Sequence, residues 1–304
     1  MSDRSRGEAR QQPAATGTGF PLGRSNEETA RLQRQAEELA PVSRVLLERT
    51  AIGPGQHVID VGCGPRGILE LLVEHVGPGG RIVGLDSDPA LVELATRFAA
   101  ERGWDNVELI CADARHSGLP SDTFDLVHAR TLLIGLSQPE DVLTELVRLT
   151  RPGGWLVGME PDAEHPVCHP PHPAVDRLSE LLTRALAGAG GDPHFGRRLA
   201  ELYRRAGLVD VTVDIRAPVY PPGHSRRTVL ADLIRSLRGP ILGLGLATRA
   251  SSRSWKQRPG CTSSSPRRWS FPASSSLHGA ARPSREEAGC VPALISLASS
   301  GGRR

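Results

Sequence analysis

Residues 57–67 constrain this chain more than any other segment, because an apolar run there leads directly into three closely spaced glycines. Residues 58–61 are typical of a buried strand, and the apolar residues that follow Gly67 are typical of a helix. Glycine is needed where backbone passes close to a ligand or adopts a positive φ. The first turn of a helix adds unpaired N–H groups and the positive end of a dipole. The segment therefore predicts a strand, a ligand-binding loop and a helix.

Asp60 narrows the kind of ligand, because it lies at the end of this strand, two residues before Gly62. A loop that binds the pyrophosphate of a dinucleotide usually has an apolar residue at that place. A carboxylate there suits a cationic ligand instead, such as one with an amino-acid ammonium or a sulfonium group.

Strand patterns alternate with helix patterns from residue 56 to residue 160. This alternation predicts an α/β fold with an open, doubly wound and mostly parallel sheet, whose ligand crevice lies at the carboxyl ends of the strands. A helix over 26–50, interrupted by Pro41, is expected to precede it. The expected strands are 57–61, 81–85, 107–111, 124–128 and 154–159, and the expected helices between them are 66–76, 89–102 and 139–150.

Two segments, about 161–192 and 220–247, are expected to be helical lid insertions that cover the substrate side of the crevice. A helix over 194–206 and a strand over 209–219 separate them. The second lid is apolar and carries four arginines: Arg226, Arg227, Arg235 and Arg238. We expect residues 1–25 to be a disordered N-terminus and residues 26–250 to form one folded domain.

The charge of the chain is divided unevenly along its length. Residues 1–250 carry a net charge of −4, so this part has no basic footprint for nucleic acid, and residues 251–304 carry +7. No apolar run is long enough to span a bilayer. The five cysteines are scattered without the spacing of metal ligands. With 36 Arg and one Lys, the chain is typical of a GC-rich bacterial genome. We expect a cytoplasmic protein with no membrane, nucleic-acid or metal partner.

Residues 251–304 form a low-complexity basic tail that contains 14 serines and no lasting apolar periodicity. One interpretation is a disordered C-terminal tail. The other is a frameshift near residue 250. GC-rich codons for residues 251–257, displaced by one nucleotide, can spell Glu-Leu-Glu-Glu-Leu-Glu-Ala, a strong helix former, and the same shift over 266–280 can spell a strand pattern.

The motifs between residues 57 and 160 together resemble those of the class I S-adenosylmethionine-dependent methyltransferases. The chain is similar to the small-molecule group that includes the ubiquinone- and menaquinone-type enzymes, from about residue 26 to 247. The loop 60–64 resembles the first motif of the family. Acidic residues also end the second and third strands, and segments 124–130 and 149–154 resemble the fourth motif and the turn before the fifth strand.

The resemblance implies S-adenosylmethionine as cofactor and methyl transfer to a small-molecule acceptor as activity. It implies that Asp86 accepts the ribose hydroxyls and that Asp113 accepts the adenine amino group, while the glycine loop cradles the methionine part. The cofactor-binding residues that it implies are Asp60, Gly62, Cys63, Gly64, Asp86, Ser87, Asp113, Ala114 and Ala129.

Other interpretations of these motifs stay open. Asp86 lies 19 residues after Gly67, a spacing that also suits the ribose carboxylate of an NAD(P)-dependent oxidoreductase. Asp88 is expected to cap the next helix, with Pro89 in its first turn. Members of the family end with an antiparallel hairpin, yet the strand over 209–219 has no evident partner in the sequence. A methyltransferase-like protein made inactive by the lack of its last strand is therefore a further alternative.

Methyl transfer needs a general base only when the acceptor is a hydroxyl or an acidic carbon. His128, at the crevice end of the fourth strand, is the best-placed candidate. Members of the family often have a His-Leu pair shortly after the fourth motif, where this chain has Gly135-Leu136. The apolar, arginine-bearing lid fits a small, fairly apolar acceptor with an acidic group. The sequence does not decide the acceptor atom or the oligomeric state.

Overall fold

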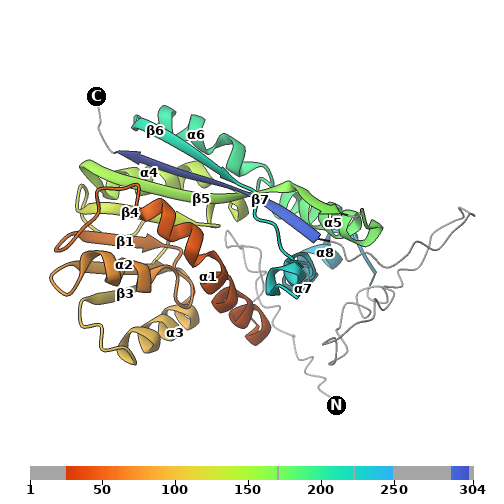
Figure 1. The fold of residues 1–304 in the computed structure, drawn as a ribbon, viewed down its shortest axis with the longest axis horizontal. Coiled ribbons are helices and arrows are strands. Elements are labelled where there is room, and N and C mark those ends of the chain that lie inside the picture. Colours follow the sequence, from red (N-terminus) through yellow and green to blue (C-terminus); the bar gives the residue numbers. More distant parts are fainter. Residues whose placement is uncertain (1–24, 170, 222, 249–288, 301–304) are drawn as a thin grey trace, which may run out of the picture.

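The computed structural model describes residues 25–169, 171–221, 223–248 and 289–300 (Figure 1). Residues 1–24, which make up nearly all of the expected disordered N-terminus, lie outside this described part. The same is true of residues 249–288 and 301–304 of the expected tail.

The described chain forms one seven-stranded sheet with the order β3-β2-β1-β4-β5-β7-β6. Strands β1 to β5 run parallel to one another, and β7 is antiparallel to β5 and β6 on either side of it. This confirms the predicted doubly wound, mostly parallel sheet. The strands are β1 (His57–Val61), β2 (Arg81–Asp86), β3 (Val107–Cys111), β4 (Phe124–Arg130), β5 (Thr150–His169), β6 (Val209–Arg216) and β7 (Gly289–Ser300).

Helices cover both faces of the sheet and extend beyond the end toward which β1 points (Figure 1). Helices α1 to α4 and α6 begin and end within a few residues of the bounds predicted for them. The helices are α1 (Asn26–Leu47), α2 (Leu69–Val76), α3 (Pro89–Ala100), α4 (Pro139–Leu149), α5 (Pro173–Gly188), α6 (Phe195–Arg205), α7 (Val229–Ser236) and α8 (Arg238–Gly243), with short 3₁₀ turns η1 (Leu133–Gly135) and η2 (Ser225–Thr228).

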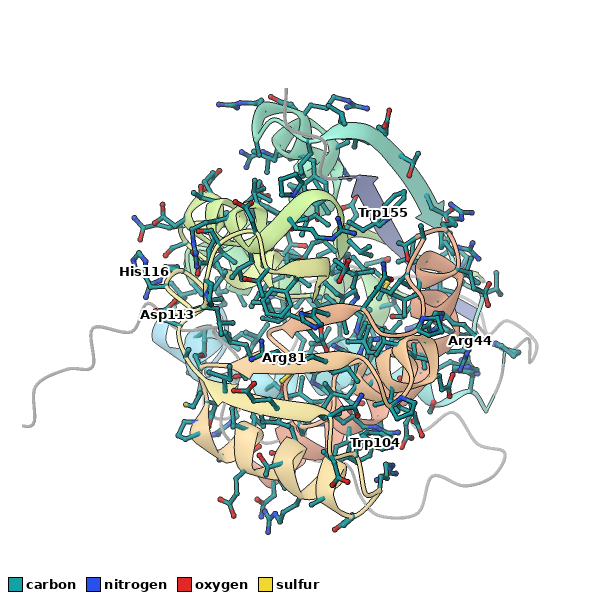
Figure 2. All side chains as sticks on the ribbon, turned by 90° about the vertical axis from the view of Figure 1, so that its left-hand side faces the viewer. Arg44, Arg81, Trp104, Asp113, His116 and Trp155 are labelled. Carbon is teal, nitrogen blue, oxygen red and sulfur yellow. The ribbon has the colours of Figure 1, made fainter. Side chains whose placement is uncertain are left out.

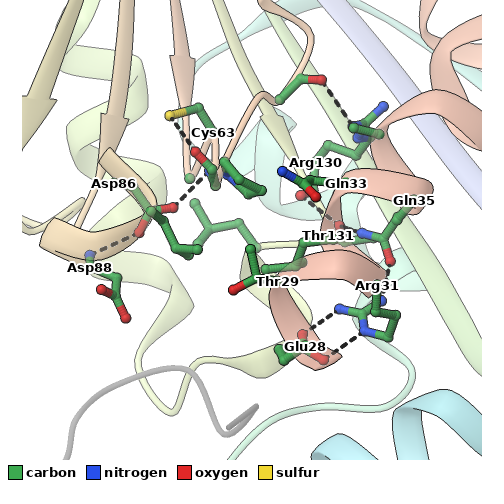
Figure 3. Close-up of a pocket in the computed structure, with 18 of the residues that line it drawn as sticks. Glu28, Thr29, Arg31, Gln33, Gln35, Cys63, Asp86, Asp88, Arg130 and Thr131 are labelled. Atoms are coloured by element: carbon green, nitrogen blue, oxygen red, sulfur yellow. Dashed lines mark hydrogen bonds and ion pairs between the residues drawn. The ribbon is translucent and has the colours of Figure 1, made fainter. Parts of the chain in front are cut away.

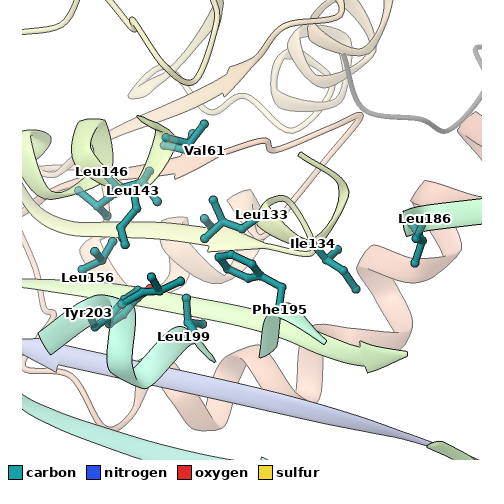
Figure 4. Packing of buried hydrophobic residues seen from close by; sticks show 14 of the residues in the cluster. Val61, Leu133, Ile134, Leu143, Leu146, Leu156, Leu186, Phe195, Leu199 and Tyr203 are labelled. Atoms are coloured by element: carbon teal, nitrogen blue, oxygen red, sulfur yellow. The ribbon is translucent and has the colours of Figure 1, made fainter. Parts of the chain in front are cut away.

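Alternating residues along the central strands β1, β2, β4 and β5 pack into two separate cores. Val58 of β1 packs with α1 and α2, whereas the next residue, Ile59, packs with the helices on the opposite face. Figure 4 shows the second core, where Tyr203 of α6 lies near Leu156 of β5 and Phe195 of α6 lies near Leu133. The period of two in the strands thus buries both faces and leaves the strand ends free to form a site.

β7 corrects one prediction about the end of the chain. The strand over 209–219 was expected to lack a partner, but β7 pairs with it and with β5 at the same time, for example at Leu297, which lies between Gly158 and Val213. Residues 289–300 of the expected disordered tail are therefore part of the sheet. This strand was not predicted, because it follows a long serine-rich segment and because strand pairing joins residues far apart in the chain.

Two smaller predictions were also wrong. α1 continues through Pro41 instead of being interrupted there, because the remaining side chains of the helix, such as Leu39 and Leu46, stay packed in the core. β5 continues to His169 rather than ending at 159, so the first lid segment begins as an extension of the sheet. None of the described helices has the length and apolar character to cross a bilayer.

Candidate active site

A cavity of about 740 Å³ opens at the carboxyl ends of the parallel strands, where the sequence placed the ligand crevice. α1 forms one wall, the loops after β1, β2 and β4 form the floor, and α5 and α7 form the far wall. Figure 3 shows the floor and the α1 wall. Seven of the ten predicted site residues line this cavity: Asp60, Gly62, Cys63, Gly64, Asp86, Ser87 and Ala114.

The loop after β1 needs its glycines for two different reasons. Gly62, Gly64 and Gly67 have φ values of +74°, +58° and +48°, which L-residues rarely adopt. A Cβ atom on Gly67 would lie 2.0 Å from Oδ2 of Asp60, so this glycine makes room for the carboxylate. A Cβ on Gly64 would meet no atom within 4 Å, although Gly64 lines the cavity. Gly64 thus offers bare backbone to a ligand.

Asp60 is 2% exposed and is held by two donors. Its Oδ2 accepts the backbone N–H of Ile68, at 2.9 Å, at the start of the following helix. Its Oδ1 lies 2.7 Å from Nδ1 of His128, the residue opposite it on β4. Because both partners come from neighbouring elements, the carboxylate has one fixed orientation at the cavity floor.

Asp86 holds the loop after β1 to the end of β2. One carboxylate oxygen accepts the backbone N–H of Gly64 and the other accepts that of Asp88, each at 2.9 Å. Burial raises the pKa of Asp86, while these backbone donors lower it in part. Each oxygen keeps lone pairs for a further donor, so hydroxyl groups of a ligand can complete the site. Asp88 caps α3 through the N–H of Ala90, as predicted.

Three predicted site residues do not line the cavity. The Asp113 carboxylate is bound by Nε and Nη2 of Arg115, whose hydrogen bonds lower the pKa of Asp113, and it lies at the margin of the molecule (Figure 2). Ala129 is fully buried in the core that contains Ile59 and the α6 residues Phe195 and Tyr203. His128 is 1% exposed beneath Asp60, and its Nε2 is buried without a hydrogen-bond partner in the described part of the chain.

Sequence analysis missed Arg130, which lies two residues after His128 on the same face of β4 and lines the cavity. Its guanidinium donates to Oγ of Ser43 at 3.0 Å and lies 3.5 Å from the carbonyl oxygen of Gly67. Burial lowers the pKa of Arg130 to about 10, and the nearby Asp60 acts in the opposite direction. Because Arg130 follows His128 by two residues on a strand, the sequence could have indicated that both side chains lie on the same face of β4. It could not have indicated that Arg130 lies close to Ser43 on α1.

The α1 wall is fastened to the floor by a chain of polar contacts. Arg31 donates through Nε and Nη2 to the carboxylate of Glu28, at 2.8 and 2.6 Å, and through Nη1 to Gln35 at 2.7 Å. Gln35 in turn donates to Oγ1 of Thr131, which follows β4 with a φ of +52°. Glu28 also accepts from Ser236 of α7. The wall therefore bridges the strand ends and the far wall across the cavity.

The comparisons with known proteins agree with this architecture. Residues 59–158 match the family model described as a methyltransferase domain. Nocamycin O-methyltransferase from Saccharothrix syringae is 31% identical over 208 residues, which cover 60% of this chain and 71% of that protein. A demethylmenaquinone methyltransferase from Geobacillus sp. (strain WCH70) is 34% identical over 38% of this chain and 49% of its own length. The chain spans about half the length of several other curated relatives that it matches, and of this demethylmenaquinone methyltransferase.

The fold also resembles solved structures. The YcgJ protein from Bacillus subtilis aligns over 84% of this chain and 96% of its own, with a TM-score of 0.52 and 17% identity. At that identity the likeness concerns the fold alone.

Proposed function

Because the chain belongs to the class I S-adenosylmethionine-dependent methyltransferases, we propose that it transfers a methyl group from S-adenosylmethionine to a small-molecule acceptor. The observation that carries this proposal is the joint presence of Asp60, Asp86 and the bare backbone of Gly64 on one cavity floor. The family match and the relatives are methyltransferases, so nothing here favours the NAD(P)-dependent oxidoreductase alternative.

The donors and acceptors of the floor fit the cofactor. Two carboxylates suit its ammonium group and its ribose hydroxyls, which we assign to Asp60 and Asp86. The guanidinium of Arg130 suits its carboxylate, because it lies beside Gly67 and has neutral hydrogen-bond partners in the described structure. Gly62, Cys63, Gly64, Ser87 and Ala114 complete the contact surface. Asp113 and Ala129 stay predictions, since neither lines the cavity.

When bound, the cofactor supplies an electrophilic methyl group on a sulfonium, and the protein contributes alignment and exclusion of water. Two further acidic residues line the cavity, and each is paired with an arginine: Glu28 with Arg31, and Asp162 with Arg197. No histidine belongs to the cavity lining in the described ranges. We therefore propose that His128 orients Asp60, while its predicted action as a general base remains a separate prediction.

Calorimetric titration with S-adenosylmethionine and with NAD tests the proposal. S-adenosylmethionine is expected to bind and NAD is not. Asp86→Ala is expected to weaken S-adenosylmethionine binding by about tenfold or more, because two charge-assisted hydrogen bonds are lost. Asp105→Ala, at an exposed position away from the cavity, is the matched control and is expected to bind normally. Tighter binding of NAD than of S-adenosylmethionine contradicts the proposal.

We further propose that the protein is bacterial and cytoplasmic, supported by the arginine-rich composition and by bacterial relatives.

The frameshift hypothesis can now be stated as a choice between two last strands. In the chain as written, residues Gly289–Ser300 form the last strand. The shifted frame would supply it from residues 266–280. The DNA sequence around codon 250 decides between them, and stop codons in the shifted frame across this stretch contradict a frameshift.

A further inference from the structure

Arg226 lines the cavity from the 3₁₀ turn that leads into α7. It is 6% exposed, an unusual degree of burial for a guanidinium. Its Nε is buried without a hydrogen-bond partner in the described part of the chain. A buried donor that stays unpaired is costly, so this side chain has capacity for a ligand that accepts a hydrogen bond.

The one carboxylate paired with Arg226 in the described structure approaches it from outside the cavity lining. Oε2 of Glu38 on α1 lies 3.2 Å from Nη1 of Arg226, and Glu38 does not line the cavity. The ring of Tyr220 lies 5.7 Å from the guanidinium carbon. Glu38 and Tyr220 thus hold the guanidinium, and neither of them belongs to the cavity lining to which Arg226 itself contributes.

A second cation lies close enough to affect Arg226. The two guanidinium groups line the same cavity, and the charge of Arg226 contributes to the lowered pKa of Arg130. Like charges in a cavity repel each other, and an anion bound at either one relieves that repulsion. The cofactor carboxylate has been assigned to Arg130, so Arg226 is left for the acceptor.

The wall of the cavity that α5 and α7 form is apolar. The leucines Leu182 and Leu186 of α5 and Leu230 and Leu233 of α7 line the same cavity as Arg226, together with Leu237 and Ile134. A ligand that is charged throughout would leave these side chains against polar groups. The surface fits a molecule with an apolar body and one anionic group.

We propose that the methyl acceptor is an apolar organic anion and that Arg226 binds its negative charge. The proposal names the substrate class of the site described above and so rests on the proposed function. It goes beyond the general expectation that the arginine-bearing lid suits an acceptor with an acidic group, because it assigns the binding of that group to one of the four arginines. Arg227, next to it, does not line the cavity.

The test uses 1-naphthylacetate and its neutral amide, 1-naphthylacetamide, which have nearly the same shape but differ in charge. Each is titrated into the full chain by calorimetry, with and without S-adenosylhomocysteine. The carboxylate is expected to bind about tenfold more tightly than the amide. Arg226→Gln is expected to remove this preference, and Arg226→Lys to keep part of it. Arg227→Gln is the matched control and is expected to retain it.

Glu38→Gln provides a variant with the opposite expected sign. It keeps hydrogen-bonding capacity toward Arg226 but removes the compensating charge, so the carboxylate is expected to bind more tightly than to the unmodified chain. The Glu38→Gln variant also tests the inference independently of whether the Arg226 variants fold, because it leaves the guanidinium in place. Circular dichroism and S-adenosylhomocysteine affinity report the fold of each variant.

Equal affinity for the two probes, failure of both to bind, or an unchanged preference in Arg226→Gln overturns the inference. Failure of S-adenosylhomocysteine to bind, with the charge preference present, overturns the proposed function instead. The two failures are distinguishable because the probe titrations do not require the cofactor product.

Discussion

Nδ1 of His128 lies 2.7 Å from Oδ1 of Asp60, across two strands that the sequence separates by 68 residues. The two residues are direct partners in the register of β1 and β4, and both are almost completely buried. His128 therefore contacts Asp60 from the neighbouring strand, while Asp60 also lines the cavity. This contact links the proposed cofactor site to the middle of the sheet.

We predict that His128→Leu weakens S-adenosylhomocysteine binding by about tenfold, because Asp60 loses one of two groups that orient it. His128→Asn retains a donor near the position of Nδ1 and is expected to restore part of the affinity. Calorimetry measures both variants. If affinity is unchanged while the acid limb of the kcat profile disappears, His128 acts as a general base and the positioning role is wrong.

Alanine at Gly67 is predicted to destabilise the protein and to abolish cofactor-product binding, because its Cβ would lie 2.0 Å from Asp60 Oδ2. Gly77→Ala is the matched control, since its φ of +61° is also positive and a Cβ there meets no atom within 4 Å. Gly64→Ala is expected to resemble this control in thermal stability but to bind S-adenosylhomocysteine poorly. Equal Tm values for the Gly67 and Gly77 variants would falsify the steric argument.

Arg130→Gln is predicted to weaken binding of S-adenosylhomocysteine by about tenfold or more, through loss of a charged partner for its carboxylate. Binding of 5′-methylthioadenosine is expected to stay within about twofold, because that molecule has no amino-acid group. Titration of both ligands into both proteins gives the comparison. An equal loss for the two ligands contradicts the assignment of Arg130 to the cofactor carboxylate.

Glu160 predicts a pH dependence of stability. Its carboxyl is completely buried and accepts backbone N–H groups of Leu132, Leu133 and Ile134, and burial raises its pKa from 4.5 to about 7. At a pH between these two pKa values, the Glu160 carboxyl is deprotonated in the unfolded chain and still protonated in the folded chain. The free energy of unfolding is therefore expected to fall as pH rises from about 4.5 to about 7, by about 3 kcal/mol from this group. Urea unfolding measures it, and Glu160→Gln is expected to flatten the dependence. An equal slope in the variant contradicts this origin.

Deletion of residues 289–304 is predicted to cause aggregation, because it removes β7 from between β5 and β6 and leaves two unpaired edges. Deletion of residues 301–304 alone is the control and is expected to leave the protein monodisperse in the same state as the full chain. Size-exclusion chromatography distinguishes these outcomes. A well-behaved protein without residues 289–304 would show that the sheet does not depend on this strand.

Much of the fold could be predicted because its signals are local. The bounds of β1 and β3 agree with the predicted ones, since a short apolar run between turn residues is enough to define a buried strand. β7 could not be predicted in the same way. Its pairing joins residues separated by a long serine-rich segment, and nothing near residue 289 in the sequence indicates the strands on either side.

The site shows the same division. The glycine loop, Asp60 and Asp86 were identified from the sequence because each directly follows or ends a strand, and parallel strands bring their ends together. Asp113 also ends a strand, yet its neighbour Arg115 binds it away from the cavity. Arg130 and Arg226 gave no local signal of their proximity, because one lies on β4 and the other before α7.

By itself the sequence determined the doubly wound sheet and the acidic, glycine-rich floor, because periodicity and strand ends are properties of neighbouring residues. The contact of His128 with Asp60, the completion of the sheet by β7, and the presence of buried Arg130 and Arg226 in one cavity are visible in the tertiary structure alone. These are contacts between distant segments, and burial sets their charge balance, which no linear pattern records.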